Sequence, residues 1–570
     1  MRKLFAAFLF VLPLFSVAYA QEKIIAINGN KKGKDATHLV NKAIEDCKQQ
    51  KAKKIIFEKG IYEFWSDLAS DKYVFISNND HGLKSTVFDL SGMENVEIDG
   101  QGSQFIFHGY VCPFLLQNAK NIKISNLSID YARTFHSEAT IVKAYQDSLD
   151  VSFSAKYPYK VENNRLGFYD DKNAQYPFGH LLEFDSAKKE VAYMALDYIN
   201  GVDELKAKAL GKDVVRIYLK DLKGNSGNTL IFNAKNRLVP AFSISNSEQI
   251  EINKVTIFHA GGMGVVAQRS KNILLDGLKV IAQTGRMVSL TADATHFVNC
   301  QGKITIQNCI LESQMDDACN IHGVYVKVEK IISPQKVLVK LAHFQQLGLD
   351  FLFADTKVEF VTPAYLATYE VNKIKKVERL NKEYLKITFY QPISEKVKLG
   401  DIIGSLTDEP EVLIKNCVIQ KNRARGILLG SRGKIVVENN YFHTWWGAID
   451  FYANGVDWFE QGGVDNVVIR NNTFDNCNFG LNVGLGVIIV LANIKEDPAH
   501  KTYYNKNILI ENNKFRVYNP TLLFLKSVDG LIFRNNKVEK NNDYKLIPAY
   551  DGQKLEPFII TNSVNINIQP

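Results

Sequence analysis

Beyond its first twenty residues the sequence has no apolar run near the roughly 20 residues that a membrane helix needs, and it has no block of basic residues. The net charge of +8 comes from lysines spread along the chain, without basic stretches that contain interleaved aromatic residues. We therefore expect no membrane span and no nucleic-acid partner. Hydrophobic content of 46% and charged content of 23% are typical of a well-packed soluble protein.

Cysteine is also scarce, with seven residues at irregular spacing and no CxxC or Cys/His metal pattern. A zinc or dithiol redox site is not expected from such a set, and we predict no metal and no cofactor. Cys300, Cys309, Cys319 and Cys417 lie in apolar, strand-like segments. They are expected to be small core residues, although a disulfide among them stays open in an exported protein.

The first twenty residues have the features of a signal peptide. Arg2 and Lys3 precede an apolar run over residues 4–17, and Ala18-Tyr19-Ala20 supplies a cleavage site before Gln21. No cysteine follows that site, so a lipid anchor is not expected there. The mature protein is predicted to be exported, to the periplasm or outside the cell.

Most of the remaining chain consists of short segments that alternate apolar and polar residues and turn at Asn or Asp. Three pairs of equivalent positions are each 23 residues apart: Ile250 and Ile273, Val412 and Ile435, Ile508 and Leu531. A strand-turn-strand unit of that length, repeated, is one coil of a parallel β-helix, whereas helical repeats show a period of 3.6. The Asn residues at the turns suit left-handed corners and stacked side-chain amides. The sequence therefore predicts an all-β fold, a right-handed parallel β-helix.

Two segments break the repeat and are predicted to be inserted β-rich domains. Residues 135–240 and residues 324–408 contain antiparallel-looking strands without the Asn turns. The second is expected to be a small β-barrel and to form one wall of a pocket, because it follows directly after an acidic cluster. A helix over residues 36–50 is expected to cap the open end of the β-helix. The remaining parts are an N-terminal cap and first coils over 21–134, coils with the acidic cluster over 241–323, and C-terminal coils over 409–570.

The acidic cluster consists of three aspartates that the repeat is expected to bring together. Asp316 and Asp317 lie in the strand-like segment 313–323, and Asp293 lies 23 residues before Asp316. Adjacent coils of a β-helix are about 4.8 Å apart. If the extra residues of this longer coil precede Asp293, it stacks on Asp316; if they follow it, Arg286 takes that place. The similarity of residues 293–299 to residues 316–322 favours the first arrangement.

Strand alternation sets a condition on Asp317. In a regular strand over residues 315–322, Asp317 faces the core while Asp316, Asn320 and His322 point outward. Asp317 therefore reaches the site only if the strand begins after it or contains a bulge.

Three neighbouring carboxylates cannot all ionise freely, so at least one pKa is raised. A protonated acid beside an ionised base is the arrangement that inverting glycosidases use. The other interpretations are an Asp-Asp turn without a catalytic role and a calcium site.

The arrangement of Thr291-Ala-Asp293 followed by Met315-Asp-Asp317 resembles the Asn-Thr-Asp and Asp-Asp elements of polygalacturonases. Residues 21–570 as a whole more closely resemble glycoside hydrolase family 110, exported bacterial α-1,3-galactosidases. The resemblance implies inverting, metal-independent removal of terminal α-1,3-linked galactose from glycans such as the blood-group B antigen. It also implies that Asp316 is the general acid and that Asp293 and Asp317 are the candidates for the base. The Gly-His-Gly and Arg-Ile-Lys elements of polygalacturonases are not found after Asp317.

Further residues are candidates for substrate contacts, each with a structural alternative. Arg423 and Arg425 can hydrogen-bond sugar hydroxyls or can be exposed charges of the β-helix. Histidines and aromatic residues can bind sugar or can be part of the packing. The remaining candidates are Asn320, His296, His322, Trp446, Asp450 and Glu460.

Two other functions remain open at this point. One is a β-helix polysaccharide lyase that uses calcium and a Lys or Arg base, and the other is a non-catalytic glycan-binding solenoid. The expected partner is an α-galactosylated oligosaccharide or glycoconjugate. Exposed strand edges of the insertions also allow a homodimer.

Overall fold

The structure is a computed structural model that describes residues 23–28, 33–211, 213–480, 486–492, 494–495, 502–546 and 555–569. The predicted signal peptide lies outside these residues. Within the described ranges, no helix has both the length and the apolar character to cross a bilayer.

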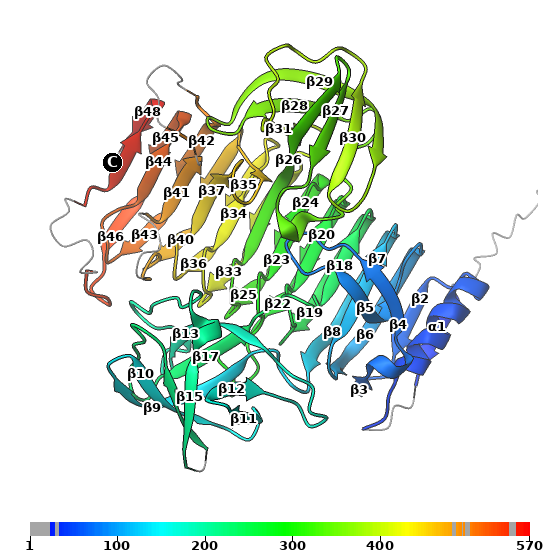
Figure 1. Cartoon of the computed structure of the whole chain (residues 1–570), viewed down its shortest axis with the longest axis vertical. Coiled ribbons are helices and arrows are strands. Elements are labelled where there is room, and N and C mark those ends of the chain that lie inside the picture. Colours follow the sequence, from blue (N-terminus) through cyan, green and yellow to red (C-terminus); the bar gives the residue numbers. More distant parts are fainter. Residues whose placement is uncertain are drawn as a thin grey trace, which may run out of the picture.

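The chain forms a parallel β-helix, as Figure 1 shows by the rows of parallel arrows. One row consists of parallel strands at equivalent positions in successive coils. In chain order they are β5 (Gly82–Asp89), β7 (Val111–Gln117), β18 (Phe242–Ser245), β20 (Val265–Gln268), β23 (Thr295–Val298), β26 (Cys319–Ser333), β34 (Ile427–Leu429), β37 (Ile449–Ala453), β41 (Ile488–Ala492), β44 (Leu523–Lys526) and β47 (Phe558–Thr561).

The other strands of the coils form a continuous parallel sheet. Its members in the coils nearest the acidic cluster are β8 (Lys120–Tyr131), β19 (Glu248–Ile257), β21 (Lys271–Asp276), β22 (Lys279–Val280), β24 (Gln301–Gln307), β25 (Ile310–Glu312), β32 (Glu411–Lys415), β33 (Val418–Gln420), β35 (Ile435–Glu438) and β36 (Tyr441–His443).

The 23-residue repeat coincides with strand pairing. The three pairs of positions taken from the sequence, Ile250 with Ile273, Val412 with Ile435 and Ile508 with Leu531, are paired neighbours on adjacent coils. Their side chains are buried in one continuous core that runs through the coils. The prediction of a parallel β-helix is confirmed.

Asparagines support the corners in two ways. Asn439, Asn471 and Asn512 adopt left-handed φ values of 56–58°, a conformation that Asn tolerates better than most residues. At the next position, the side chain of Asn472 stacks between those of Asn440 and Asn513. Its Oδ1 accepts hydrogen bonds from the backbone and side-chain N–H groups of Asn440 at 2.9 and 3.0 Å. The amide ladder thus satisfies backbone groups that the turns leave unpaired.

The N-terminal end of the β-helix is covered by α1 (Thr37–Gln50), which lies beyond β2 (Lys54–Phe57) in Figure 1. Its buried face contributes Val40, Ala43 and Ile44 to the same core as the coils. The seven cysteines are buried and free in the described structure, as expected for core residues.

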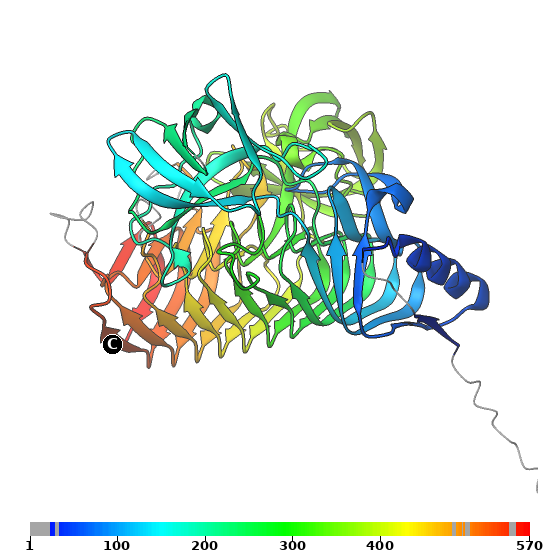
Figure 2. The same cartoon turned by 90° about the horizontal axis from the view of Figure 1, so that it is seen from below.

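Two insertions project from the same side of the β-helix (Figure 2). The first is a seven-stranded antiparallel sheet in the order β14, β13, β17, β9, β10, β16, β15. These strands are β9 (Ser137–Tyr145), β10 (Ser148–Phe153), β13 (Phe178–Asp185), β14 (Glu190–Val191), β15 (Lys206–Gly211), β16 (Val214–Tyr218) and β17 (Thr229–Ala234).

The second insertion is a closed six-stranded antiparallel barrel. Strand β26 begins in the β-helix and continues into this barrel, so the barrel grows directly out of the strand that follows Asp316 and Asp317. The other strands are β27 (Lys336–Lys340), β28 (Lys357–Thr362), β29 (Ala367–Arg379), β30 (Tyr384–Phe389) and β31 (Ile402–Ser405).

Candidate active site

The charged residues of the site lie in the turns that precede three neighbouring strands, β23, β26 and β34. The strands are in register through Thr295, Cys319 and Ile427. Two residues before these positions are Asp293, Asp317 and Arg425. Each coil therefore contributes one charged side chain to the same corner of the β-helix.

The register corrects the predicted stacking by one residue. Asp293 lies next to Asp317 rather than Asp316, and the backbone N–H of Ala294 donates to the Asp317 carbonyl at 2.9 Å. The offset between these coils is 24 residues at this row, because the irregular turn before β26 holds one residue more than the repeat. Arg286, the alternative neighbour, instead forms a buried ion pair with Asp130.

The condition on Asp317 is met, because β26 begins at Cys319, after both acidic residues. Alternation holds from that point: Cys319 and Ile321 enter the core, while Asn320 and His322 lie on the other face, buried outside it. The turn itself does not alternate, since Ala318 is also a core residue.

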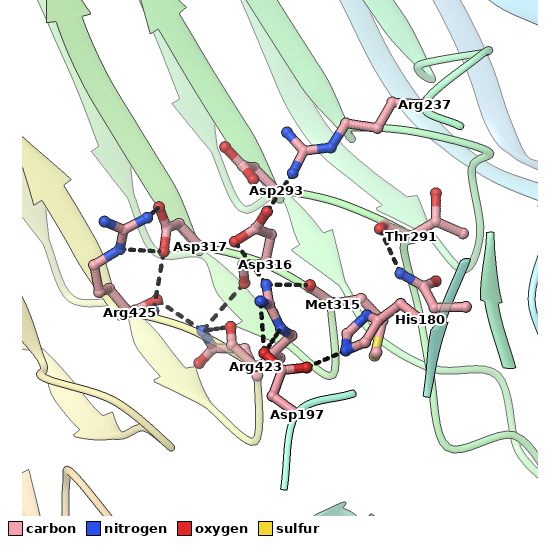
Figure 3. Close-up of polar contacts among 12 residues, drawn as sticks. His180, Asp197, Arg237, Thr291, Asp293, Met315, Asp316, Asp317, Arg423 and Arg425 are labelled. Carbon is pink, nitrogen blue, oxygen red and sulfur yellow. Dashed lines mark hydrogen bonds and ion pairs between the residues drawn. The ribbon is translucent and has the colours of Figure 1, made fainter. Parts of the chain in front are cut away.

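Asp316 is held between two guanidinium groups. Arg237 Nη2 donates to its Oδ2 at 2.5 Å, and Arg423 Nη1 lies 3.3 Å from its Oδ1 (Figure 3). The Asp316 side chain is 14% exposed, compared with 3% for Asp293 and 2% for Asp317. Asp316 is therefore the member of the cluster that a ligand reaches first.

Asp317 is bound by Arg425 from the next coil. The backbone N–H and Nε of Arg425 donate to Asp317 Oδ1, both at 2.9 Å, and Nη2 donates to Oδ2 at 2.8 Å. Such bidentate contacts fix both side chains. Arg425 also lies over the ring of Trp446, 5.8 Å from its centroid.

The first insertion adds residues that sequence reasoning missed. Asp197 accepts from Arg423 Nε and Nη2 at 2.9 and 2.7 Å, and its other oxygen binds His180 Nε2. His180 lies on β13, and Arg237 follows β17. The insertion thus positions Asp316 in two ways. Its Arg237 contacts Asp316 directly, and its Asp197 holds Arg423, which contacts Asp316 from the β-helix. These residues are outside the 23-residue repeat, so no spacing in the sequence points to them.

Two buried histidines extend in a line from the side chain of Asp293. Its Oδ2 is 2.6 Å from His296 Nδ1, and His296 Nε2 is 3.0 Å from His322 Nε2. His322 Nε2 lies 3.5 Å from Glu460 Oε1, which accepts a hydrogen bond from Asn78 Nδ2 at 2.9 Å. The predicted residues His296, His322 and Glu460 therefore belong to the cluster.

The three aspartates are electrostatically unequal. Burial, together with the charge of Asp316, raises the pKa of Asp293 to about 8. Burial and the neighbouring carboxylates raise the pKa of Asp317 to about 7, against the opposing effect of Arg425. Burial also disfavours ionised Asp316, but Arg237 and Arg423 hold its pKa below the usual range. The prediction that crowding leaves a protonated carboxyl beside an ionised one agrees with these shifts.

Asp450 and Asn320 complete the cluster. Both pair with Leu428 of the strand between them, so they face the same side as His296. Burial raises the pKa of Asp450 to about 8, and Arg425 opposes this rise. Oδ1 of Asp450 and Oδ1 of Asn320 are buried without a hydrogen-bond partner, which makes them available to a ligand.

The second insertion lies beside Glu460. The backbone N–H of Asn78 donates to the Gln345 carbonyl at 2.9 Å, and Gln346 Nε2 donates to the Trp458 carbonyl at 2.8 Å. The Trp458 ring packs against His343 with ring centroids 4.6 Å apart. The barrel therefore contributes the residue 343–346 loop to one side of the site.

Comparison with known proteins identifies the family to which the chain belongs. The sequence families described as GLAA-B beta-barrel domain I, GLAA-B beta-barrel domain II and right handed beta helix region match residues 137–230, 336–403 and 402–564. The α-1,3-galactosidase A of Shewanella woodyi is 36% identical over 518 residues, which cover 90% of this chain and 84% of the relative. An α-1,3-galactosidase B of Phocaeicola vulgatus is 32% identical over 564 residues, which cover 93% and 91% of the two chains.

The relatives are named as glycosidases, so this parallel β-helix, which holds a cluster of unequal aspartates between two inserted β-domains, is a glycoside hydrolase. More narrowly, the chain belongs to glycoside hydrolase family 110, the bacterial α-1,3-galactosidases. The resemblance seen in the sequence is confirmed.

Proposed function

We propose that this protein is an exo-acting, inverting α-galactosidase that removes terminal α-1,3-linked galactose from glycans, with the blood-group B antigen and linear α-1,3-digalactosides as candidate substrates. The observation that carries the proposal is the carboxylate cluster of Asp293, Asp316 and Asp317, in which the pKa values of Asp293 and Asp317 are raised to about 8 and 7 while the pKa of Asp316 is lowered. The printed activity of the relatives supplies the linkage and the sugar.

In the proposed reaction Asp316 donates a proton to the glycosidic oxygen, because it is the most accessible of the three carboxyl groups. Asp293 or Asp317 accepts a proton from the attacking water on the opposite face of the sugar. Asp316 must first gain a proton, which Arg237 and Arg423 oppose in the free site. The source is the neighbouring protonated carboxyl that does not act as the base, since closely spaced groups titrate as one unit. A sugar hydroxyl that replaces Asp316 as the partner of Arg237 favours this transfer.

Exo-action is proposed because groups from both insertions surround Asp316. Arg237 and Asp197 come from the first insertion, and the residue 343–346 loop of the second contacts Asn78, whose carbonyl accepts from Arg237 Nη1 at 3.2 Å. A glycan that approaches between these groups reaches Asp316 by its end rather than by its middle.

The first test is Asp316→Asn assayed on an α-1,3-galactoside. We expect the rate to fall about 10²–10⁴-fold while circular dichroism and the melting temperature show a retained fold. NMR of the wild-type reaction should show β-galactose as the first product, as inversion requires. Undiminished activity of the variant would contradict the assignment, and α-galactose as the first product would contradict inversion.

Substrates with different leaving groups distinguish the acid role of one carboxyl from the base role of another. An aryl α-galactoside with a good leaving group needs no general acid, so Asp316→Asn should recover most of its activity on that substrate. Asp293→Asn and Asp317→Asn are the variants to compare, because loss of a base slows both substrates equally. Equal losses for Asp316→Asn on both substrates would remove it from the acid role.

Metal removal tests the lyase alternative. Asp316 and Asp317 are bound by guanidinium groups, and Asp293 by an imidazole, which occupy the places where a cation would bind. We expect EDTA to leave the rate unchanged. Loss of activity with EDTA, together with unsaturated products, would favour a calcium-dependent lyase instead.

We also propose export to the periplasm or outside the cell, on the basis of residues 1–20. The N-terminus of the mature protein, read by mass spectrometry, should be Gln21. A homodimer stays a prediction, which sedimentation of the purified protein tests.

A further inference from the structure

Asp293, His296, His322 and Glu460 form a continuous polar line that runs away from the proposed catalytic carboxyls. Contacts of 2.6, 3.0 and 3.5 Å join successive members. All four side chains are at least nine-tenths buried. They come from neighbouring strands and the turn before one of them, because β23 pairs with β26, and β38 (Glu460–Gln461) pairs with β26 one and two residues after His322.

The hydrogen-bond partners determine where the protons are. His322 Nδ1 is 2.7 Å from the Gly323 carbonyl oxygen, which can only accept, so this nitrogen carries a hydrogen. In neutral His322 the Nε2 atom is then an acceptor, and the hydrogen between the two rings belongs to His296 Nε2. Neutral His296 consequently has a bare Nδ1, and the hydrogen in the 2.6 Å contact belongs to Asp293 Oδ2.

This resting arrangement conflicts with the role of a base. An Asp293 that carries a proton on Oδ2 cannot readily take another from water. Its pKa of about 8 agrees with the protonated form at neutral pH, and burial lowers the pKa of His296, in agreement with a neutral ring. Asp293 needs a place to release its proton.

The line of contacts offers that place through two short transfers. One proton moves from Asp293 Oδ2 to His296 Nδ1, and the proton on His296 Nε2 moves to His322 Nε2. The result is an Asp293 carboxylate, a neutral His296 of the other tautomer and a His322 imidazolium. No bond other than these N–H and O–H bonds changes. The new positive charge lies beside the Glu460 carboxylate, which Asn78 holds in place.

We infer that His296, His322 and Glu460 form a proton relay behind Asp293, in which His322 holds the proton that Asp293 releases before it accepts one from the attacking water. The inference rests on the proposed function, with Asp293 as the base. His296, His322 and Glu460 act through Asp293 and are positioning residues rather than catalytic ones. When the product leaves, Asp293 passes the proton that it took from water to the deprotonated Asp316, and the proton held by His322 then returns to Asp293 along the same line.

Other charged groups also face the relay and act on its titration. Those that face Asp293 and His296 are Asp316, Asp317, Arg237, Arg425 and Glu460. The groups that face His322 are His296, His343 and Glu460. Of these, only Glu460 is a carboxylate in contact with His322, so its charge is the one to remove.

The test is the pH dependence of kcat/KM in Glu460→Gln and His322→Gln. Without the relay, Asp293 ionises only by releasing its proton to solvent, so the acidic limb of the profile should move up towards pH 8. We expect activity at pH 6.5 to fall at least tenfold, activity at pH 9 to stay within about threefold of wild type, and KM to change little. The matched control is Glu190→Gln, which removes a buried carboxylate from another histidine, His443, at 3.0 Å. Its profile should keep the wild-type shape.

Loss of activity by the same factor at every pH would mean a merely structural role and would overturn the relay, as would an unchanged profile. Failure of the proposed function is distinguishable, because the wild-type protein would then release no galactose at any pH. If the variants do not fold, ¹⁵N NMR of histidine-labelled wild-type protein tests the same arrangement. It should show His296 protonated on Nε2 and His322 on Nδ1, and the opposite tautomers would overturn the inference.

Discussion

At the scale of single residues, an excess of buried carboxyls over guanidinium groups determines the protonation of the site. Arg237, Arg423 and Arg425 are the guanidinium groups that contact or face the cluster. The carboxyls are Asp197, Asp293, Asp316, Asp317, Asp450 and Glu460. Since three cations cannot balance six buried or half-buried carboxylates, some of the carboxyls keep their protons, and Asp293, Asp317 and Asp450 have the raised pKa values.

The pair of Asp317 and Arg425 is expected to matter for stability as well as for chemistry. Arg425→Met leaves a buried carboxyl without its bidentate partner, which costs up to about 3–5 kcal/mol where Asp317 is ionised. The folded-state pKa of Asp317 then rises above the wild-type value of about 7. Below pH 7 Asp317 is protonated in both folded proteins, so the deficit should be small there and should grow as pH rises from about 7 to 9. Urea unfolding at these pH values measures it.

Arg534→Met is the control, because Arg534 also donates to one carboxylate, Glu511, from Nε and Nη2, at 2.9 and 2.8 Å, but its side chain is 44% exposed, compared with 25% for Arg425. It should lose far less stability and keep the wild-type kcat/KM. Equal losses in the two variants would show that burial is not the source of the effect.

At the scale of elements, the asparagine ladder is expected to stabilise the corners from within. In Asn472→Ala, the backbone and side-chain N–H groups of Asn440 and the Val437 carbonyl lose their partner. With about 1–3 kcal/mol for each buried orphan, we expect a loss of roughly 3 kcal/mol in the free energy of unfolding. Asn536→Ala, at the more exposed end of the ladder, should cost less because water replaces the lost contacts. Equal costs in denaturant unfolding would contradict the ladder.

The elements also show where the sequence was informative and where it was not. Strand pairing follows hydrophobic alternation, so the pairs Ile250 with Ile273 and Val412 with Ile435 could be predicted from their spacing. The turns before β23 and β26 do not alternate. One added residue there makes Asp317, rather than Asp316, the neighbour of Asp293 on the next coil. The repeat period therefore predicts the pairing of strands well and the positions of turn residues poorly, because a turn accepts extra residues without loss of core packing.

At the scale of the whole molecule, contacts between distant segments were invisible to the sequence. Arg423 and Asp197 are 226 positions apart, and no repeat relates them. The sequence predicted that both insertions exist, and it predicted that the second lies beside the cluster. It gave no reason to expect His180, Asp197 and Arg237 in the site, since their placement depends on how the first insertion packs against the coils.

A second long-range contact predicts a pH effect on stability. His443 of the β-helix binds Glu190 of the first insertion, which also accepts from Tyr544 at 2.9 Å. Burial lowers the pKa of His443, but the hydrogen bond and charge of Glu190 outweigh it and raise the pKa above the ordinary value. The contribution is therefore complete below the unfolded pKa of about 6.5 and is lost as pH rises through the folded one.

His443→Gln should remove this dependence. We expect the difference in melting temperature between wild type and variant to be larger at pH 6 than at pH 8.5. A difference that is constant with pH would mean that the imidazole contributes packing alone.

The barrel that grows out of β26 has a consequence for the order in which the site is assembled. Residues 324–408 stand between the turn that carries Asp316 and Asp317 and the coil that supplies Arg423 and Arg425. A chain that emerges with its N-terminus first presents the two carboxylates long before their arginines exist, and they stay hydrated until the barrel closes and the next coil docks. The candidate active site is thus completed late, and a nascent chain that ends before residue 423 has an exposed acidic turn without the arginines that pair with it.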